Sequence, residues 1–169
     1  GIDQFAAIAG SSLGGMEVLM WTALHPQRTR SIICMAAAAA VPVASVAWHL
    51  IGRKLIQADP AFNGGDYYDG QAPLYGLALA RMISHKTFVH LDAIERRARQ
   101  DVVQPDDVLA WYRVRDQFQS YMLHQGKKFV KRFDANTYLR ITNMWLRFDP
   151  LRDAGVRSYE KLFAISRKH

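Results

Sequence analysis

The chain has 169 residues, of which 50% are hydrophobic and 22% charged, so its composition is that of a globular protein with a core of its own. Its formal net charge is +7, but the 22 Lys and Arg residues are spread along the sequence and form no aromatic-interleaved stripe, so we expect no nucleic-acid binding. No apolar run reaches the roughly 20 residues that span a bilayer. We therefore expect no membrane span.

The first 35 residues have the pattern of a strand, a helix and a second strand. Residues 5–9 form a short apolar run that predicts a buried strand, and residues 13–24 show helical spacing up to Pro26, where a helix should stop. Residues 31–35 predict a second buried strand, in which Cys34 packs as a small hydrophobe. A strand–helix–strand unit of this length favours a parallel pair with a right-handed crossover.

The rest of the chain predicts helices and no further strand. The expected helices cover residues 44–58, 77–88, 92–99, 105–124 with a continuation over 127–133, 135–148 and 159–167. Residues 61–75 are rich in Gly, Asp, Tyr and Pro and predict an irregular loop. The fold class is therefore α/β, with a long helical insertion after the second strand.

The turn between the first strand and the first helix carries the candidate chemistry. It reads Gly10-Ser11-Ser12-Leu13-Gly14 and so contains the pattern G-x-S-x-G. In a nucleophile elbow this pattern places the serine on a sharp turn with its hydroxyl exposed, while the next backbone N–H faces a developing oxyanion. Ser12 is the predicted nucleophile and Leu13 the predicted backbone donor. The alternative is an ordinary strand–helix loop or a phosphate-binding Gly-rich turn.

A serine nucleophile of this kind needs an acid and a histidine base later in the chain. The chain contains six histidines, at positions 25, 49, 85, 90, 124 and 169, and none follows a late strand that carries an acid. We therefore expect the triad Asp and His beyond His169. The chain begins without Met and ends without a closing element, and for that reason we expect it to be a fragment.

Several segments together resemble the homoserine O-acetyltransferase family. They are residues 10–16 (GSSLGGM), 58–60 (ADP), 64–67 (GGDY), 76–82 (GLALARM), 121–129 (YMLHQGKKF) and 132–139 (RFDANTYL). The resemblance implies an α/β-hydrolase fold fragment. Its expected parts are a core portion at 1–42, a helical lid at 43–150 and a return to the core at 151–169.

The resemblance also implies residue roles. Ser12 would be acylated by an acyl-CoA, and Arg81 would be the lid arginine that binds the amino-acid carboxylate, a task suited to its planar fork. Phe88 lies where the family has a substrate-site tyrosine, and so keeps the ring but loses the hydroxyl. His49-Leu50 replaces the family's Asn-Glu, and the acidic residue expected near Leu146 is missing. These departures concern the acceptor substrate more than the fold.

The leading hypothesis is a CoA-dependent O-acyltransferase that transfers an acetyl or succinyl group to L-homoserine through an acyl-serine, in methionine biosynthesis. The alternatives are a serine hydrolase or esterase of the same fold, and an inactive lid or dimerisation fragment. We expect no bound cofactor or metal, with acetyl-CoA or succinyl-CoA as co-substrate. The resemblance further implies a homodimer through the lid helices, and the single cysteine favours the reducing cytoplasm.

Overall fold

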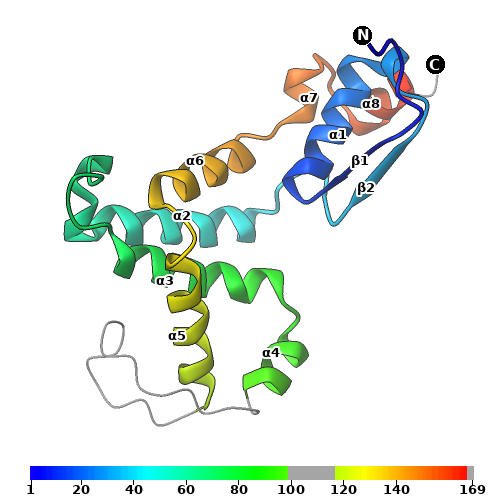
Figure 1. Cartoon of the computed structure of the whole chain (residues 1–169). Coiled ribbons are helices and arrows are strands. Elements are labelled where there is room, and N and C mark those ends of the chain that lie inside the picture. The colour runs from blue at the N-terminus through cyan, green and yellow to red at the C-terminus, as the bar shows by residue number, and fades with distance from the viewer. Residues whose placement is uncertain (99–116, 167–169) are drawn as a thin grey trace. The chain divides into compact units, whose positions relative to one another are not determined.

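The computed structural model describes residues 1–98 and 117–166. The chain divides into two compact units. One consists of residues 1–42 and 144–169, and the other of residues 43–143. Figure 1 shows the strands and helix α1 of the first unit in blue, and the helices of the second in cyan to orange.

The first unit contains a two-stranded parallel sheet. Strands β1 (Ile8–Ser11) and β2 (Ile32–Met35) pair in the register Ile8 to Ile32 through Ser11 to Met35. Helix α1 (Leu13–Leu24) joins them, followed by the 3-10 turn η1 (Pro26–Arg28). The predicted parallel strand–helix–strand unit is confirmed. The first strand, however, begins three residues later than predicted, because Phe5 forms only an isolated bridge with Thr29.

The predicted burial of the two strands is wrong for this chain. Residues of β1 alternate between half-buried and exposed, and Ile33 and Met35 of β2 are 53% and 48% exposed. Cys34, predicted to pack as a small hydrophobe, is also exposed, with its Sγ 3.5 Å from the carbonyl oxygen of Gly15. The reason is geometric: a pair of strands has no central member, so each keeps an edge without a neighbour among the described residues.

Two short helices complete the first unit. Helix α8 (Tyr159–Ser166) packs against α1 and buries Leu162, which is 2% exposed. Helix α7 (Pro150–Asp153) was not predicted from the sequence. It begins with Pro150 in the first turn and with the Asp149 carboxylate accepting from the backbone N–H of Arg152 at 3.1 Å, a recognisable helix start.

The second unit is helical throughout its described residues. Its elements are α2 (Val43–Ala58), the 3-10 segment η2 (Pro60–Gly65), α3 (Leu74–Phe88), α4 (Leu91–Ala98), α5 (Gln117–Val130) and most of α6 (Ala135–Leu146). The predicted loop at 61–75 is thus partly helical, since Asp59 caps η2 through the backbone N–H of Ala61. The predicted helix at 105–124 lies outside the described residues up to 116, and α5 ends before Phe133.

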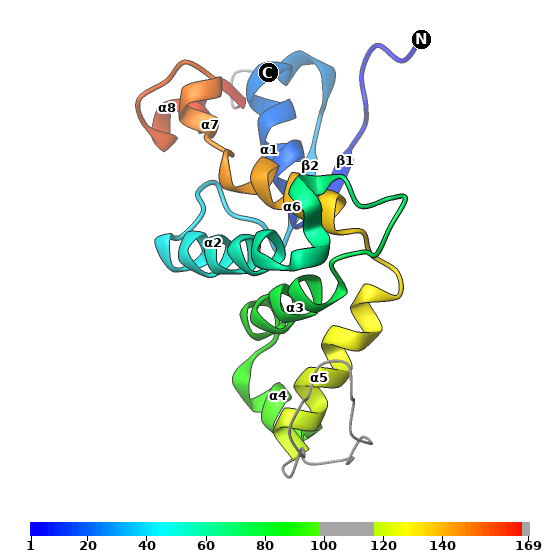
Figure 2. The ribbon, with the colours of Figure 1, turned by 90° about the vertical axis from the view of Figure 1, so that its left-hand side faces the viewer.

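Close helix packing defines the core of this second unit. Helices α2 and α3 lie side by side in Figures 1 and 2. A Cβ at Gly76 would lie 2.5 Å from the Leu55 carbonyl oxygen, so only glycine permits this approach. The buried cluster contains Ile56, Phe62, Tyr67, Leu77, Ala80, Phe129, Ala135 and Tyr138.

A hydrogen-bond network joins η2 to the start of α6. The Tyr67 hydroxyl donates to the Asp134 carboxylate at 2.5 Å and accepts from the backbone N–H of Asn136 at 2.9 Å. The Asn136 side chain donates to the Gly65 carbonyl at 2.8 Å, and Asp134 also accepts from the backbone N–H of Thr137 at 2.7 Å. The network links the segments GGDY and RFDAN, because each supplies hydrogen-bond partners to the other.

Candidate functional site

Ser12 lies at the junction of β1 and α1 in a backbone conformation that L-residues rarely adopt. Its φ is 54° and its ψ is −120°, and its side chain is exposed. Its backbone N–H donates to the Met35 carbonyl at 3.0 Å, and its carbonyl accepts from the Met16 N–H at 3.1 Å. Such a conformation costs on the order of 1–3 kcal/mol and persists because the flanking strand and helix hold it.

The glycines around Ser12 differ in how much room the fold leaves for a side chain. A Cβ at Gly10 would lie 2.1 Å from the carbonyl oxygen of Gly14, and a Cβ at Gly15 would lie 2.7 Å from the Ala37 Cβ. At Gly14 nothing lies within 4 Å. Close packing of the turn therefore accounts for Gly10, against backbone, and for Gly15, against the Ala37 side chain. Among the described residues, it does not account for Gly14.

The backbone beside Ser12 offers donors for a negative charge. Leu13 is the first residue of α1, so its N–H has no acceptor within the helix, and the helix N-terminus adds partial positive charge. No backbone acceptor for Leu13 is found outside the helix among the described residues. The structure thus places the predicted oxyanion donor next to the predicted nucleophile.

Among the described residues of the first unit, the structure brings no histidine to Ser12. Within residues 1–98 and 117–166, the Ser12 hydroxyl makes no hydrogen bond. His25 follows the far end of α1, about 20 Å along the helix at 1.5 Å per residue. His49 and His85 are buried in the second unit, and His90 is exposed beside Asp92 at 3.6 Å. His169 lies outside the described residues.

Arg81 on α3 is a half-buried cation supported by two aromatic rings. Its Cζ lies 5.0 Å from the ring centroid of Phe129 and 5.9 Å from that of Phe88. Burial lowers the pKa of Arg81 below its usual range, and the charge of Arg132 lowers it further. Among the described residues, the Arg81 side chain makes no ion pair and no hydrogen bond. An anion that reached the guanidinium could therefore bind without displacing a described partner.

Phe88 lies beside Arg81, with its ring centroid 5.9 Å from the Arg81 Cζ. It is the last residue of α3, its ring is 63% exposed, and its centroid is 6.5 Å from that of His49. The structure thus brings Arg81, Phe88 and His49 into one region of the second unit. The exposed ring offers an apolar wall without a hydroxyl donor.

Sequence reasoning missed four further polar side chains around Arg81. The Ser84 hydroxyl is 2.5 Å from that of Tyr138 and donates to the Ala80 carbonyl at 2.9 Å. The Nε2 of His85 is 2.8 Å from the Tyr121 hydroxyl, and burial lowers the pKa of His85, with the charges of Arg81 and Arg97 adding to the effect. Ser84 and His85 follow Arg81 at the i+3 and i+4 spacing, a signal that the sequence already contained.

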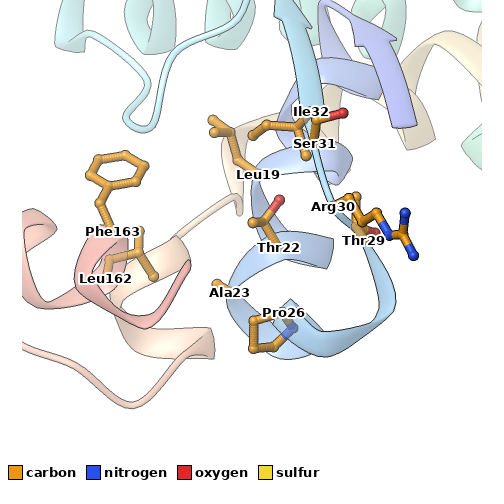
Figure 3. Close-up of a pocket in the computed structure, with 10 residues that line it drawn as sticks. All are labelled: Leu19, Thr22, Ala23, Pro26, Thr29, Arg30, Ser31, Ile32, Leu162 and Phe163. Atoms are coloured by element: carbon orange, nitrogen blue, oxygen red, sulfur yellow. The ribbon is translucent and has the colours of Figure 1, made fainter. Parts of the chain in front are cut away.

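A separate cavity of about 190 Å³ lies at the other end of α1 from Ser12. Figure 3 shows Leu162 and Phe163 of α8 on one side of it and the end of α1 with the start of β2 on the other. Its residues belong to the last two turns of α1 and beyond, so it is not the surroundings of Ser12. Neither Leu13 nor any glycine of the elbow lines it.

The described residues contain neither a metal-binding cluster nor a membrane-spanning helix. They contain no group of three or more His, Cys, Asp or Glu side chains placed to hold a metal ion. In the same residues, no helix is both long enough and apolar enough to cross a bilayer.

Comparison with known proteins identifies the family. A family model for the alpha/beta hydrolase fold matches residues 1–163, so the chain belongs to this family. The chain is 44% identical over 152 residues to a homoserine O-succinyltransferase from Nitrosospira multiformis and 41% identical over 154 residues to one from Halorhodospira halophila. These matches cover 89% and 90% of this chain but only 40% of each relative. The resemblance to homoserine O-acyltransferases is thereby confirmed.

A solved structure supports the same fold. The homoserine O-acetyltransferase from Bacillus anthracis superposes with a TM-score of 0.81 at 20% identity. The match covers 96% of this chain and 43% of that protein. The predicted fold class, a portion of an α/β-hydrolase fold with a helical lid, is confirmed by this likeness and by the family model.

Proposed function

We propose that this chain is the nucleophile-and-lid portion of a homoserine O-acyltransferase that uses an acyl-CoA in methionine biosynthesis. The observation that carries the proposal is the backbone of Ser12, at φ 54° and ψ −120°, between a strand and a helix. An exposed serine held in that conformation beside free helix N–H groups suits acyl transfer. The proposed acceptor and acyl group are taken from the names of the two relatives, each a homoserine O-succinyltransferase.

The proposed reaction has two halves that share Ser12. Its Oγ attacks the thioester carbonyl, the carbon–sulfur bond breaks, and CoA leaves as the thiol with the proton from the serine hydroxyl. The Leu13 N–H stabilises the oxyanion of each tetrahedral intermediate. The homoserine hydroxyl then attacks the acyl-serine, the ester bond to Ser12 Oγ breaks, and O-acylhomoserine leaves while Ser12 takes up the proton that the homoserine hydroxyl loses. We propose that the acid and base lie outside residues 1–169.

Arg81 is the proposed anchor of the amino-acid acceptor. Its half-buried fork faces no carboxylate among the described residues, and the rings of Phe129 and Phe88 support it. A bound carboxylate would therefore meet two N–H donors without displacing a protein partner.

We favour succinyl-CoA over acetyl-CoA as the donor. The two relatives described above are named for succinyl transfer and are more than 40% identical to this chain. The acetyltransferase from Bacillus anthracis is 20% identical and speaks for the fold alone.

The test uses the parent polypeptide, meaning the longest natural polypeptide that contains this chain. Incubated with succinyl-CoA, it should gain one succinyl group on the peptide that contains Ser12, detected by mass spectrometry. Ser12→Ala should gain none, and Ser11→Ala, one residue away in β1, should react like the wild type. A folded parent that forms no adduct with either acyl-CoA would refute the proposal.

Phe88 favours a second candidate, a hydrolase that passes the acyl group to water. It lacks the hydroxyl expected at a substrate-site position, and its ring is 63% exposed. Adding homoserine, serine or buffer alone to the isolated acyl-enzyme separates the two candidates. Transfer predicts that homoserine discharges the ester much faster than buffer, and hydrolysis predicts equal rates.

We also propose a cytoplasmic homodimer joined through the lid helices. Helix α2 exposes Val43 by 84%, Leu50 by 51% and Ile51 by 45%, an apolar surface that a second copy could cover. Sedimentation of the parent polypeptide and of Leu50→Lys would test this. If Leu50→Lys sediments as a dimer like the wild type, the dimer contact does not include this surface of α2.

A further inference from the structure

Two arginines of the second unit share one aromatic ring. The Cζ of Arg81 lies 5.0 Å from the centroid of Phe129, and the Cζ of Arg132 lies 5.9 Å from it. Phe129 is 8% exposed and belongs to the core cluster, so the ring is fixed. Arg81 comes from α3, whereas Arg132 follows the end of α5. Packing of two helices therefore brings together cations that are 51 positions apart in the sequence.

Among the described residues, neither arginine has an anionic partner. In the part of the chain that the structure describes, no carboxylate lies within ion-pair distance of either guanidinium, and neither donates a hydrogen bond from its side chain. Like charges so placed repel each other, and the lowered pKa of Arg81, due first to burial and then to Arg132, reflects this repulsion. A bound anion would remove the repulsion and use both forks.

The neighbouring hydroxyls are already engaged. Tyr138 is paired with Ser84 at 2.5 Å, and Tyr121 with His85 at 2.8 Å. These pairs hold α3 against α6 and α5, while the Nδ1 of His85 is buried without a hydrogen-bond partner among the described residues. The pairs therefore form a fixed polar support beside the two guanidiniums.

We propose that Arg132 acts with Arg81 as a second carboxylate-binding residue, and that the two guanidiniums on the Phe129 ring grip the carboxylate of a substrate. The identity of that substrate rests on the proposed function, but the anion site does not. Two carboxylates are available in the proposed reaction, that of homoserine and the free end of a succinyl group. Arg132 is thus a specificity-determining residue for one of them.

The first experiment measures anion binding without catalysis. The Nε–Hε resonance of Arg81 in the parent polypeptide is followed by NMR during titration with acetate, and with acetamide as the uncharged control, at constant ionic strength. We expect a saturable shift with acetate only. Arg132→Met should weaken the acetate Kd at least about fivefold, whereas Lys131→Met, which removes an adjacent exposed charge, should leave it within about twofold.

The second experiment identifies the carboxylate through kinetics. Arg132→Met should raise one KM at least about fivefold and change kcat little, as expected when ground-state binding is lost. A raised KM for homoserine assigns the site to the acceptor. A raised KM for succinyl-CoA but not for acetyl-CoA assigns it to the donor. Arg132→Lys, which keeps the charge but loses the fork, should fall between the wild type and Arg132→Met.

Two outcomes overturn the proposal. In one, Arg132→Met and Lys131→Met weaken acetate binding equally, because the effect would then be nonspecific attraction by nearby positive charge. The other is an unchanged KM for every substrate. If the parent binds acetate at Arg81 but transfers no acyl group, the proposed function fails while the two-arginine site stands.

Discussion

Replacing Ser12 by glycine should make the protein more stable while abolishing the proposed acyl transfer. At φ 54° and ψ −120°, a serine pays about 1–3 kcal/mol of backbone strain, which glycine does not. Glycine also loosens the unfolded chain, which costs about 0.4–1 kcal/mol. The net expectation is a gain of about 1 kcal/mol in the free energy of unfolding, or about 2–4 °C in Tm for a protein of this size.

The assay is urea unfolding of the parent polypeptide and its variants, followed by far-UV circular dichroism. The matched control is Ser11→Gly, one residue earlier in β1, where φ is not positive. Glycine there should cost about 0.5–1 kcal/mol. If Ser12→Gly is destabilised as much as Ser11→Gly, the turn holds no strain and the reasoning is refuted. Ser12→Ala separates the two effects, because it removes the hydroxyl but keeps the strained Cβ.

Three further predictions concern packing and pH. Gly10→Ala should lower the free energy of unfolding by about 1–3 kcal/mol, because its methyl would meet the carbonyl oxygen of Gly14 at 2.1 Å, and Gly14→Ala should cost nothing in the same urea titration. Tyr138→Phe should destabilise by about 0.5–1.5 kcal/mol, since the buried Ser84 hydroxyl loses this hydrogen bond and keeps the one to the Ala80 carbonyl. For Asp134, burial alone would raise the pKa, but hydrogen bonds from Tyr67 and Thr137 outweigh it and lower the pKa below 3.8. Its stabilising contribution is therefore complete above the unfolded pKa of about 3.9 and is lost as the pH falls through the lower folded value. Asp134→Asn should flatten the acid limb of the curve of Tm against pH, and an unchanged limb would contradict this.

Sequence analysis predicted best the elements whose bounds depend on a few neighbouring residues. Helix α1 has the predicted bounds, because the strained turn at Ser12 starts it and Pro26 prevents its continuation. The parallel pairing of β1 and β2 followed from the length of the crossover. Alternation and apolar runs could not show that the strands are exposed, since burial depends on neighbours rather than on the strand itself.

The sequence predicted the turn around Ser12 but not the surroundings of Arg81. The turn around Ser12 is one continuous motif, and its geometry is a property of a few consecutive residues. The surroundings of Arg81 come from α3, α5 and α6, and only the packing of these helices places Arg132 and Tyr138 near it. Helical spacing could have predicted Ser84 and His85 as neighbours, but not their partners. The roles of Ser12, Leu13, Arg81 and Phe88 stay predictions.

The glycine contacts of α3 mark where that helix tolerates no larger side chain. An added methyl at Gly76 would meet the backbone of α2, and on roughly the opposite side of the helix Ala78 packs against Gly126 of α5. Phe88, by contrast, is 63% exposed. A mutant library built on α3 can therefore vary Phe88, whereas variation at Gly76 would remove members by misfolding before any property of the site could be assayed.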